Sequence, residues 1–249
     1  MTTTCPNWDR ESWISSDEYI AHSVKALSEC LKITSNSKIL DIGCGRAGIT
    51  IALAEASKVT TPIEGIDISD TINEAPNCKK VNLLQIDAIS YLKEQPDELY
   101  HGVILKRMLH CIKEELRKPL LQEVHRCLKK NARALVFIMP PEITIPMFMQ
   151  GKHTFLQEQL HFQDILNLGQ DCLFETETTH FCFNVEIEKQ RYFDLLRQRF
   201  MSNLRNFSDN EIENGVLEID RDYPDDVLKF EDLMYIIHLI KKDSTSQSL

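Results

Sequence analysis

The chain has 249 residues, of which 43% are hydrophobic and 27% charged, and its formal net charge is −10. This length and composition predict one soluble α/β domain with an elaborated end. No apolar run reaches the roughly 18 residues that a membrane span needs, and the first residues lack the pattern of a secretory signal. The acidic balance disfavours nucleic acid, which binds positive surfaces. We therefore expect a cytoplasmic protein whose partner is neither a nucleic acid nor a membrane.

Eight cysteines are spread along the chain without a C-x-x-C pair. This spacing fits neither a zinc site nor a disulfide framework. We expect no metal site, and thiols that mostly act as small buried hydrophobes in a reducing compartment. The cysteines are Cys5, Cys30, Cys44, Cys78, Cys111, Cys127, Cys172 and Cys182.

The first 140 residues predict short strands that alternate with helices. Ser15 and Glu18 have the spacing of a capping box, and apolar residues then recur on one face of a helix over about residues 17–32. Strands separated by helices imply right-handed crossovers and a parallel sheet covered on both faces. The expected strands are 38–42, 63–67, 81–85, 102–105 and 134–139, with helices at about 47–57 and around Leu116 to Leu128.

The pattern changes after Pro141. We expect a helix at 155–168, a β-rich run at 171–185, a helix at 188–204 and a last strand at 233–240. A second capping box pairs Ser208 with Glu211, and Phe207 and Ile212 have the spacing of a hydrophobic staple. A strand, helices and another strand after a βα core fit a sheet that an antiparallel pair completes.

A glycine-rich loop, with Gly43, Gly45 and Gly48, lies between the first strand and its helix. Glycines there permit a tight turn and let a ligand approach backbone N–H groups. The spacing also matches the dinucleotide fingerprint. Asp67 ends the second strand. A carboxylate at this position can bind the ribose hydroxyls of a dinucleotide or of another nucleoside cofactor. The loop alone therefore leaves a nicotinamide enzyme and a methyltransferase both open.

Three features favour a positively charged cofactor. Asp41, two residues before Gly43, would repel a pyrophosphate but attract an ammonium or sulfonium. Asp87 ends the third strand, where it can accept a hydrogen bond from an exocyclic amine. The chain also shows no second mononucleotide-binding half, which a dinucleotide fold would use.

Several motifs in order over about residues 38–140 resemble class I S-adenosylmethionine-dependent methyltransferases of the small-molecule type. Looser likenesses to the same class are found in Arg197–Ser202 and in Tyr235-Ile-Ile. The motifs that carry the resemblance are Lys38–Gly45, Ile63–Ser69, Gln85–Ala88, Gly102–His110 and Val124–Arg133.

The resemblance implies a role for each matched residue in binding S-adenosylmethionine. Gly43 and Gly45 would line the methionine moiety, with Asp41 close by. Lys106 would reach the methionine end through its carbonyl. The nucleoside would be held by Asp67 at the ribose, by Ile68 and Asp87 at the adenine and its amino group, and by the backbone of Ala88 at a ring nitrogen.

The sequence departs from the family pattern at three places. Ala47 stands where the family usually has glycine, so the loop is expected to be reshaped. Asn131-Ala132 replaces a Gly-Gly turn, and asparagine accepts a left-handed conformation. The stretch from Asp67 to Val81 is short, so the second helix should be stunted.

Methyl transfer from a sulfonium needs alignment of nucleophile and methyl more than a dedicated base. His110, after the fourth strand, is the best candidate for a general base, or it satisfies backbone groups at a helix start. Arg107 either pairs with a substrate carboxylate or is solvated. Trp13 and Tyr19 either cover the cofactor with aromatic faces or pack in the core.

Candidates for a substrate cover lie after residue 140. Phe148, within Pro146–Met149, and the run His161-Phe162 either contact substrate or pack under helices. Arg197 either binds an acidic substrate or lies on a solvated helix face, and Arg199 and Arg205 have the same two readings.

We predict a Rossmann-like α/β fold: a mostly parallel seven-stranded sheet with helices on both faces, an antiparallel last strand and a helical cap. The whole chain is expected to be a single domain. It comprises an N-terminal helical lid (1–37), a cofactor-binding core (38–140), a cap and substrate region (141–225), and the last strand with its tail (226–249).

The expected function is S-adenosylmethionine-dependent in-line methyl transfer to a small molecule, which yields S-adenosylhomocysteine. Two alternatives stay open: an NAD(P)-linked oxidoreductase, and a protein that binds S-adenosylmethionine without catalysis. The sequence identifies neither the acceptor nor the oligomeric state.

Overall fold

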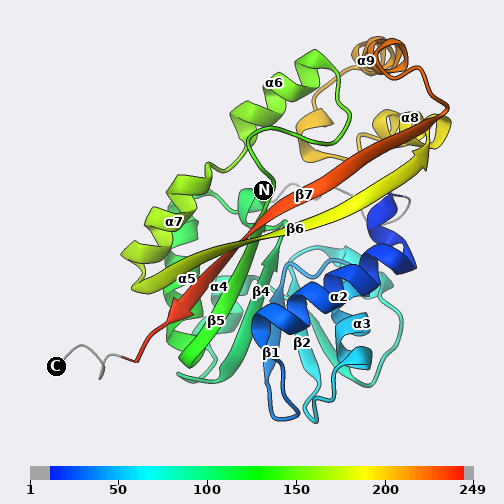
Figure 1. Ribbon diagram of the computed structural model, residues 1–249. Helices are drawn as coiled ribbons and strands as arrows, with labels where there is room; N and C mark the ends of the chain where they lie inside the picture. The colour runs from blue at the N-terminus through cyan, green and yellow to red at the C-terminus, as the bar shows by residue number, and fades with distance from the viewer. Residues whose placement is uncertain (1–11, 244–249) are drawn as a thin grey trace.

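The computed structural model describes residues 12–243, built around a seven-stranded sheet in the order β3-β2-β1-β4-β5-β7-β6 (Figure 1). Pairing is parallel from β3 to β5, and β7 runs antiparallel to both of its neighbours. The predicted fold class is therefore confirmed. The strands are β1 (Ile39–Ile42), β2 (Ile63–Asp67), β3 (Val81–Gln85), β4 (Tyr100–Lys106), β5 (Leu128–Ile138), β6 (Phe174–Glu188) and β7 (Val227–Lys241).

Helices cover both faces of the sheet, and each face has its own hydrophobic cluster. On one face Leu27 of α2 and Leu53 of α3 pack in the same cluster as Ile39 of β1. Leu40, the next residue of β1, belongs to the cluster of the opposite face with Leu120 of α5, because alternate strand residues point to opposite sides. The helices are α2 (Asp17–Leu31), α3 (Gly48–Ala56), α4 (Ala88–Lys93), α5 (Glu114–Cys127), α6 (Met149–Glu158), α7 (Phe162–Asp171), α8 (Lys189–Arg197) and α9 (Asp209–Asp222), with 3-10 turns η1 (Trp13–Ser15), η2 (Asp70–Glu74), η3 (Leu109–Cys111) and η4 (Ser202–Leu204).

The parallel half follows the predicted elements closely, with one error at the first helix. β2 and β3 have the predicted bounds, and only the short turn η2 forms between them, as expected. α2 is capped by Ser16, whose hydroxyl accepts the backbone N–H of Tyr19 at 3.2 Å. The predicted Ser15–Glu18 capping box is wrong, because Ser15 is the last residue of η1 and already has helical geometry.

The predicted left-handed residue lies within β5, near its start. Asn131 adopts φ 62°, which asparagine tolerates better than most side chains. The ladder between β4 and β5 shifts register there, so that Tyr100 pairs with Leu128 while Gly102 pairs with Arg133. β5 consequently begins at Leu128, six residues earlier than predicted.

In the cap, the helix predicted at 155–168 is two helices, α6 and α7. The chain is extended at Gln159, with ψ 144°, and the Gln159 side-chain amide donates to the backbone carbonyls of Met139 and Pro140. These carbonyls follow β5, so a contact distant in sequence breaks the helix. The sequence pattern of residues 155–168 does not indicate this break.

The helix predicted at 188–204 ends early, at Arg197. Arg199 adopts φ 53° and donates its N–H to the carbonyl of Leu196, and Phe200 donates to that of Leu195. These two bonds form a Schellman ending, which normally uses glycine. Because arginine and not glycine occupies the left-handed position, the sequence did not predict this helix end. The capping box of Ser208 and Glu211 does form, at the start of α9.

β6 and β7 are long antiparallel strands that reach beyond the parallel sheet. Their ladder runs from the Phe174–Lys241 pair to the Glu188–Val227 pair, and their far ends lie beside α8 and α9 (Figure 1). This extension joins the cap to the sheet. Within residues 12–243, no helix is both long enough and apolar enough to cross a bilayer.

Candidate functional site

A cavity of about 410 Å³ lies where β1, β2, β4 and β5 end, between the sheet and the cap. Its sheet side includes Asp41, Asp67 and Asp87, and its cap side includes residues of α6 and η4. The carboxyl ends of strands in an open parallel sheet are the usual place for a ligand. The cavity therefore lies where the sequence placed the cofactor.

The loop after β1 is tied to β2 by its backbone. The N–H groups of Gly43 and Cys44 both donate to the carbonyl of Ile66, at 2.8 and 3.1 Å. Gly43 adopts φ 74°, and a Cβ there would lie 2.6 Å from the Cβ of Met108. Only glycine fits between the two loops at this point.

Asp67 braces the same loop while it lines the cavity. Its carboxylate accepts the backbone N–H of Gly45 at 2.8 Å and that of Ser69 at 2.8 Å. Ile68 follows with 47% of its surface exposed. A half-exposed isoleucine at a strand end provides an apolar surface beside a carboxylate, as binding of a nucleoside requires.

Asp41 is the most deeply buried acid of the site. Its carboxylate accepts the hydroxyl of Thr50 at 2.6 Å, inside the protein. Burial raises the pKa of Asp41 to about 6, against the opposing effects of the Thr50 hydrogen bond and the Lys106 charge. A buried carboxylate with this pKa gains most from a nearby cation.

Asp87 and Ala88 complete the sheet side of the cavity. Asp87 is the N-cap of α4 and accepts the backbone N–H of Ser90 at 2.9 Å. Both residues line the cavity. The start of α4 therefore brings the Asp87 carboxylate and the Ala88 backbone to the same edge of the cavity.

Lys106 is the last residue of β4, and its side chain contacts Tyr19. The Lys106 ammonium donates to the Tyr19 hydroxyl at 3.1 Å and lies 4.9 Å from the centre of its ring. Tyr19 is fully buried and is not among the residues that line the cavity. Tyr19 thus supports a lining residue, which agrees with packing, the second of its two interpretations, and not with a cover over the cofactor.

His110 lines the cavity from the turn after β4. Its surface is open to the cavity, but protein surrounds the ring. Removal from bulk water, together with the charges of Arg107, Arg117 and Arg205, lowers the pKa of His110 to about 4. The imidazole is therefore neutral at physiological pH and can accept a proton, but it is a weaker base than an ordinary histidine.

Arg107 lines the cavity but is committed to an internal ion pair. Its guanidinium donates to both carboxylate oxygens of Asp232, at 2.6 and 2.7 Å. The indole N–H of Trp13 donates to the same carboxylate at 2.9 Å. This arrangement leaves the pairing of Arg107 with a substrate carboxylate without support. Asp232 was not predicted, because the residues around it in the sequence do not indicate a partner 125 residues away.

Trp13 packs in the core and does not cover the cavity. Its ring makes edge contacts with Phe200 and Phe230 and stacks on Tyr192. The neighbouring Ile14, however, does line the cavity. The N-terminal segment thus contributes to the site through the residue after the one predicted.

The cap side of the cavity is largely apolar and was not predicted. Its residues come from just after β5, from α6 and the following loop, and from the segment after α8, which are far apart in sequence. A few polar groups accompany them, among them the buried amide of Asn203, which donates to the carbonyl of Gly151 at 3.0 Å. The cap-side apolar residues are Met139, Phe155, Leu160, Phe200 and Met201.

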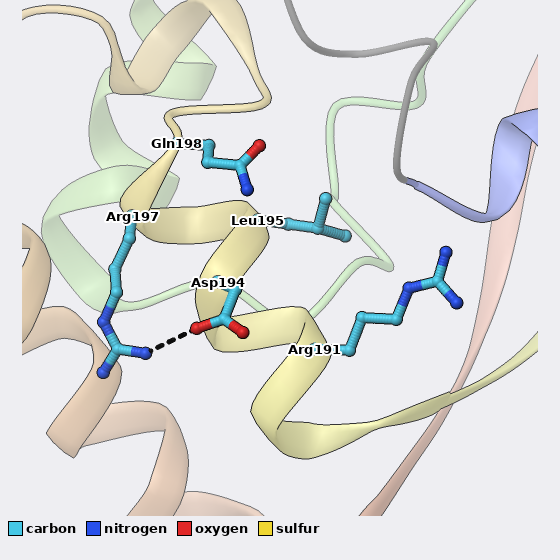
Figure 2. A pocket seen from close by; sticks show the side chains of 5 residues that line it. All are labelled: Arg191, Asp194, Leu195, Arg197 and Gln198. Atoms are coloured by element: carbon cyan, nitrogen blue, oxygen red, sulfur yellow. Dashed lines mark hydrogen bonds and ion pairs between the residues drawn. The ribbon is translucent and has the colours of Figure 1, made fainter.

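Phe148 and Arg197, two predicted substrate contacts, lie outside the cavity. Phe148 is buried in the cap against Phe207, at 5.3 Å between ring centres. Arg197 lies in a separate hollow on α8 (Figure 2), where it pairs with Asp194 at 2.9 Å, and it also pairs with Glu213 of α9 at 2.7 Å. Arg197 has the solvated, ion-paired role that was its alternative interpretation.

No cluster of three or more His, Cys, Asp or Glu side chains in residues 12–243 is arranged to hold a metal ion. Of the eight cysteines, Cys5 lies outside the described residues. The seven that are described are free thiols, and two of them, Cys44 and Cys111, line the cavity.

The fold and this acid-lined cavity define a Rossmann-like domain for a nucleoside cofactor. Comparison with known proteins narrows the class. Residues 39–131 match the family described as a methyltransferase domain. This match confirms the resemblance to the class I S-adenosylmethionine-dependent methyltransferases that the motifs indicated.

Individual relatives and structures agree with this family. A demethylmenaquinone methyltransferase of Staphylococcus carnosus is 28% identical over 156 residues, which are 61% of this chain and 63% of that protein. The chain thus matches somewhat less than two thirds of that relative's length.

Two solved structures share the fold. An S-adenosylmethionine-dependent methyltransferase from Archaeoglobus fulgidus has a TM-score of 0.57 at 18% identity, covering 90% of this chain and 94% of that one. A phosphoethanolamine N-methyltransferase from Haemonchus contortus, solved with S-adenosylhomocysteine, has a TM-score of 0.56 at 16% identity, covering 97% and 61%.

Proposed function

We propose that this protein binds S-adenosylmethionine and transfers its methyl group to a small molecule with a largely apolar body. The observation that carries the proposal is the cavity itself. It has three carboxylates on the sheet side, at the ends of successive strands, and an apolar wall on the cap side.

The charges that line the cavity fit a cationic cofactor. Within the described chain, four acids and three bases line it. Glu158 is the acid that does not lie at the sheet edge. Two of these bases are already paired: Arg46 with Glu74, and Arg107 with Asp232. The remaining field is negative, which attracts a sulfonium and opposes the pyrophosphate of a dinucleotide. The family match also favours methyl transfer over a nicotinamide-linked reaction.

Each sheet-side residue has an assigned role in this proposal. Asp67 holds the ribose hydroxyls, and Asp87 with the backbone of Ala88 holds the adenine edge. Gly43 and the carbonyl of Lys106 bind the methionine end. Ile68 packs on the adenine face. Gly45 belongs to the loop that Asp67 braces, and the buried Asp41 carboxylate adds negative charge next to this loop.

When bound, the cofactor supplies a methyl group activated by its sulfonium. The protein's task is then to align an acceptor, an effect worth up to about 7–11 kcal/mol. Phe155, Leu160 and Met201 offer an apolar surface for the acceptor body. Demethylmenaquinone, the acceptor in the name of the Staphylococcus relative, belongs to the class of molecules that such a wall suits.

His110 is assigned as the general base. It lines the cavity, and its lowered pKa keeps it neutral. We expect His110→Gln to reduce turnover about 100-fold to 10,000-fold, with the affinity for S-adenosylhomocysteine unchanged. His153→Gln, on the exposed face of α6, is the matched control and should keep full turnover. Wild-type turnover in His110→Gln would remove His110 from the mechanism.

The cofactor assignment is tested by calorimetry with S-adenosylhomocysteine. We expect Asp67→Ala to weaken binding by about 1.5–3 kcal/mol, the scale of hydrogen bonds to a charged group. Asp70→Ala removes an exposed carboxylate three residues away that does not line the cavity, and it should leave the affinity unchanged. Equal affinities in wild type and Asp67→Ala would contradict the assignment.

Catalysis is tested by transfer of a tritiated methyl group to a cell extract, followed by sizing of the labelled product. A small labelled product is expected, and label on protein or RNA would redirect the proposal to a macromolecular acceptor. Tight S-adenosylhomocysteine binding without any labelled product would favour the non-catalytic alternative. A reducing compartment such as the cytoplasm is part of the proposal, supported by the free thiols.

A further inference from the structure

A buried carboxylate outside the sheet edge holds two parts of the cavity wall together. Asp232 lies on β7 and has no exposed surface. It accepts the indole N–H of Trp13, which precedes the lining residue Ile14, and both of its oxygens accept from Arg107. Asp232, which does not line the cavity itself, therefore links η1 to the residue that follows β4.

The charge of Arg107 presents a difficulty for the proposed cofactor. Arg107 lines the cavity, and its side chain is only 10% exposed, so water screens it weakly. A guanidinium keeps its charge at any physiological pH. Left unbalanced, this cation would repel a sulfonium in the same cavity.

We propose that Asp232 is a specificity-determining residue that cancels the charge of Arg107, so that the cavity accepts a cationic cofactor. This inference rests on the proposed function. S-Adenosylmethionine carries one more positive charge than S-adenosylhomocysteine, and the two are otherwise nearly the same shape. Asp232 therefore governs the preference between cofactor and product.

Stability alone is a weak reason for such a pair. A buried ion pair often contributes no more than well-packed apolar side chains would, and aromatic rings already surround Trp13 here. Arg107 also holds a left-handed conformation, φ 56°, which is unfavourable for a side chain of this type. The fold thus maintains a strained, buried ion pair at the wall of its cavity.

The test measures the dissociation constants of both ligands by calorimetry, on wild type and on Asp232→Asn. Asparagine keeps the shape and removes the charge. We expect the ratio Kd(S-adenosylmethionine)/Kd(S-adenosylhomocysteine) to rise about ten-fold, which corresponds to ~1.4 kcal/mol. Glu213→Gln removes a carboxylate from the exposed Arg197 pair and should leave the ratio unchanged.

The double variant Arg107→Met/Asp232→Asn separates charge from shape. It removes both charges, so we expect the wild-type ratio to return. If the ratio stays at its wild-type value in Asp232→Asn, or shifts equally in the double variant, Asp232 acts only through structure and the inference is wrong. Should Asp232→Asn fail to fold, Arg107→Met alone is decisive. Removal of the cation leaves Asp232 buried and unpaired, where it either keeps its charge or takes up a proton. The ratio should therefore fall or stay at its wild-type value, and a ratio that rises would overturn the inference.

Failure of the proposed function would look different. In that case wild type itself would bind neither S-adenosylmethionine nor S-adenosylhomocysteine. Binding of both ligands by wild type, with no change of the ratio in the variants, would overturn only the role of Asp232.

Discussion

The two walls of the cavity are built in different ways. The sheet wall takes its polar groups from positions next to strand ends, such as Asp41, Asp67 and Asp87, and each is fixed by a hydrogen bond to a residue nearby or on the adjacent loop. The cap wall takes apolar residues from separate segments, among them Phe155 of α6 and Phe200 after α8. It is held by packing between elements distant in sequence.

Under the proposed function, this difference separates binding of the cofactor from choice of the acceptor. Loop geometry and strand ends define the sheet wall, so its chemistry follows from short motifs. The cap wall depends on how α6, η4 and the ends of β6 and β7 pack together. Changes in the cap can therefore alter the acceptor while the cofactor wall stays the same.

The strongest test of this comparison is removal of a side chain that packs only within the cap. Phe148 is 3% exposed, contacts Phe207 and lies against Gly215 of α9, where an added Cβ would come within 2.4 Å of the Phe148 ring. We expect Phe148→Ala to lower the free energy of unfolding by about 3–5 kcal/mol, measured by urea denaturation. Its affinity for S-adenosylhomocysteine should stay unchanged at temperatures where the variant is folded.

The matched control is Leu156→Ala on the exposed face of α6, where Leu156 is 49% exposed. Its effect on stability should stay within about 0.5 kcal/mol. Loss of ligand affinity in Phe148→Ala without loss of stability would return Phe148 to the site, as the sequence analysis suggested.

A smaller effect is expected on the sheet wall, at Asp41. Burial raises the pKa of Asp41 to about 6, above the value of about 3.9 for an unperturbed aspartate. The folded state therefore binds this proton more tightly than the unfolded state. The contribution of Asp41 to stability is full below about pH 4 and is lost as the pH rises through about 6.

Asp41→Asn should remove this loss. We expect the variant to be more stable than wild type by about 3 kcal/mol at pH 7.5 and to approach wild type near pH 4, with S-adenosylmethionine bound more weakly. Urea denaturation at several pH values measures the difference, and Asp70→Asn serves as an exposed control. A difference that does not vary with pH would show that the Asp41 carboxylate is not destabilised by burial.

The sequence predicted the sheet wall well because its signals are local. A strand, a glycine loop and an acid at a strand end are each contained within about ten residues, and β2 and β3 have the predicted bounds. The cap was predicted poorly because its decisive contacts are distant. Gln159 breaks a helix by bonding to carbonyls after β5, and Arg199 ends another helix in a conformation usually taken by glycine.

Asp232 shows the same limit within the site. Its partners, Trp13 and Arg107, are 219 and 125 residues away, and an aspartate within a strand does not reveal what it will contact. Trp13, Tyr19 and Phe148 had two interpretations in the sequence, as ligand contacts or as packing residues. The structure supports the second, because each is buried in packing.

The smallest expected effect concerns the departure from the family pattern in the glycine loop. Ala47 keeps the left-handed conformation, with φ 58°, that the usual glycine adopts freely, whereas Gly48 has no positive φ and an added Cβ would meet no atom within 4 Å. The backbone at Ala47 is therefore strained, by about 1–2 kcal/mol for an L-residue. Glycine would relieve this strain but loses more entropy on folding.

We expect Ala47→Gly to raise the free energy of unfolding by about 0.5 kcal/mol as the net of these two terms. Gly48→Ala should raise it by about 0.4–1 kcal/mol, because alanine restricts the unfolded chain. Both follow from urea midpoints measured against wild type. If Ala47→Gly destabilises the protein while Gly48→Ala stabilises it, the methyl group of Ala47, which is fully buried, contributes more through packing than its backbone strain removes.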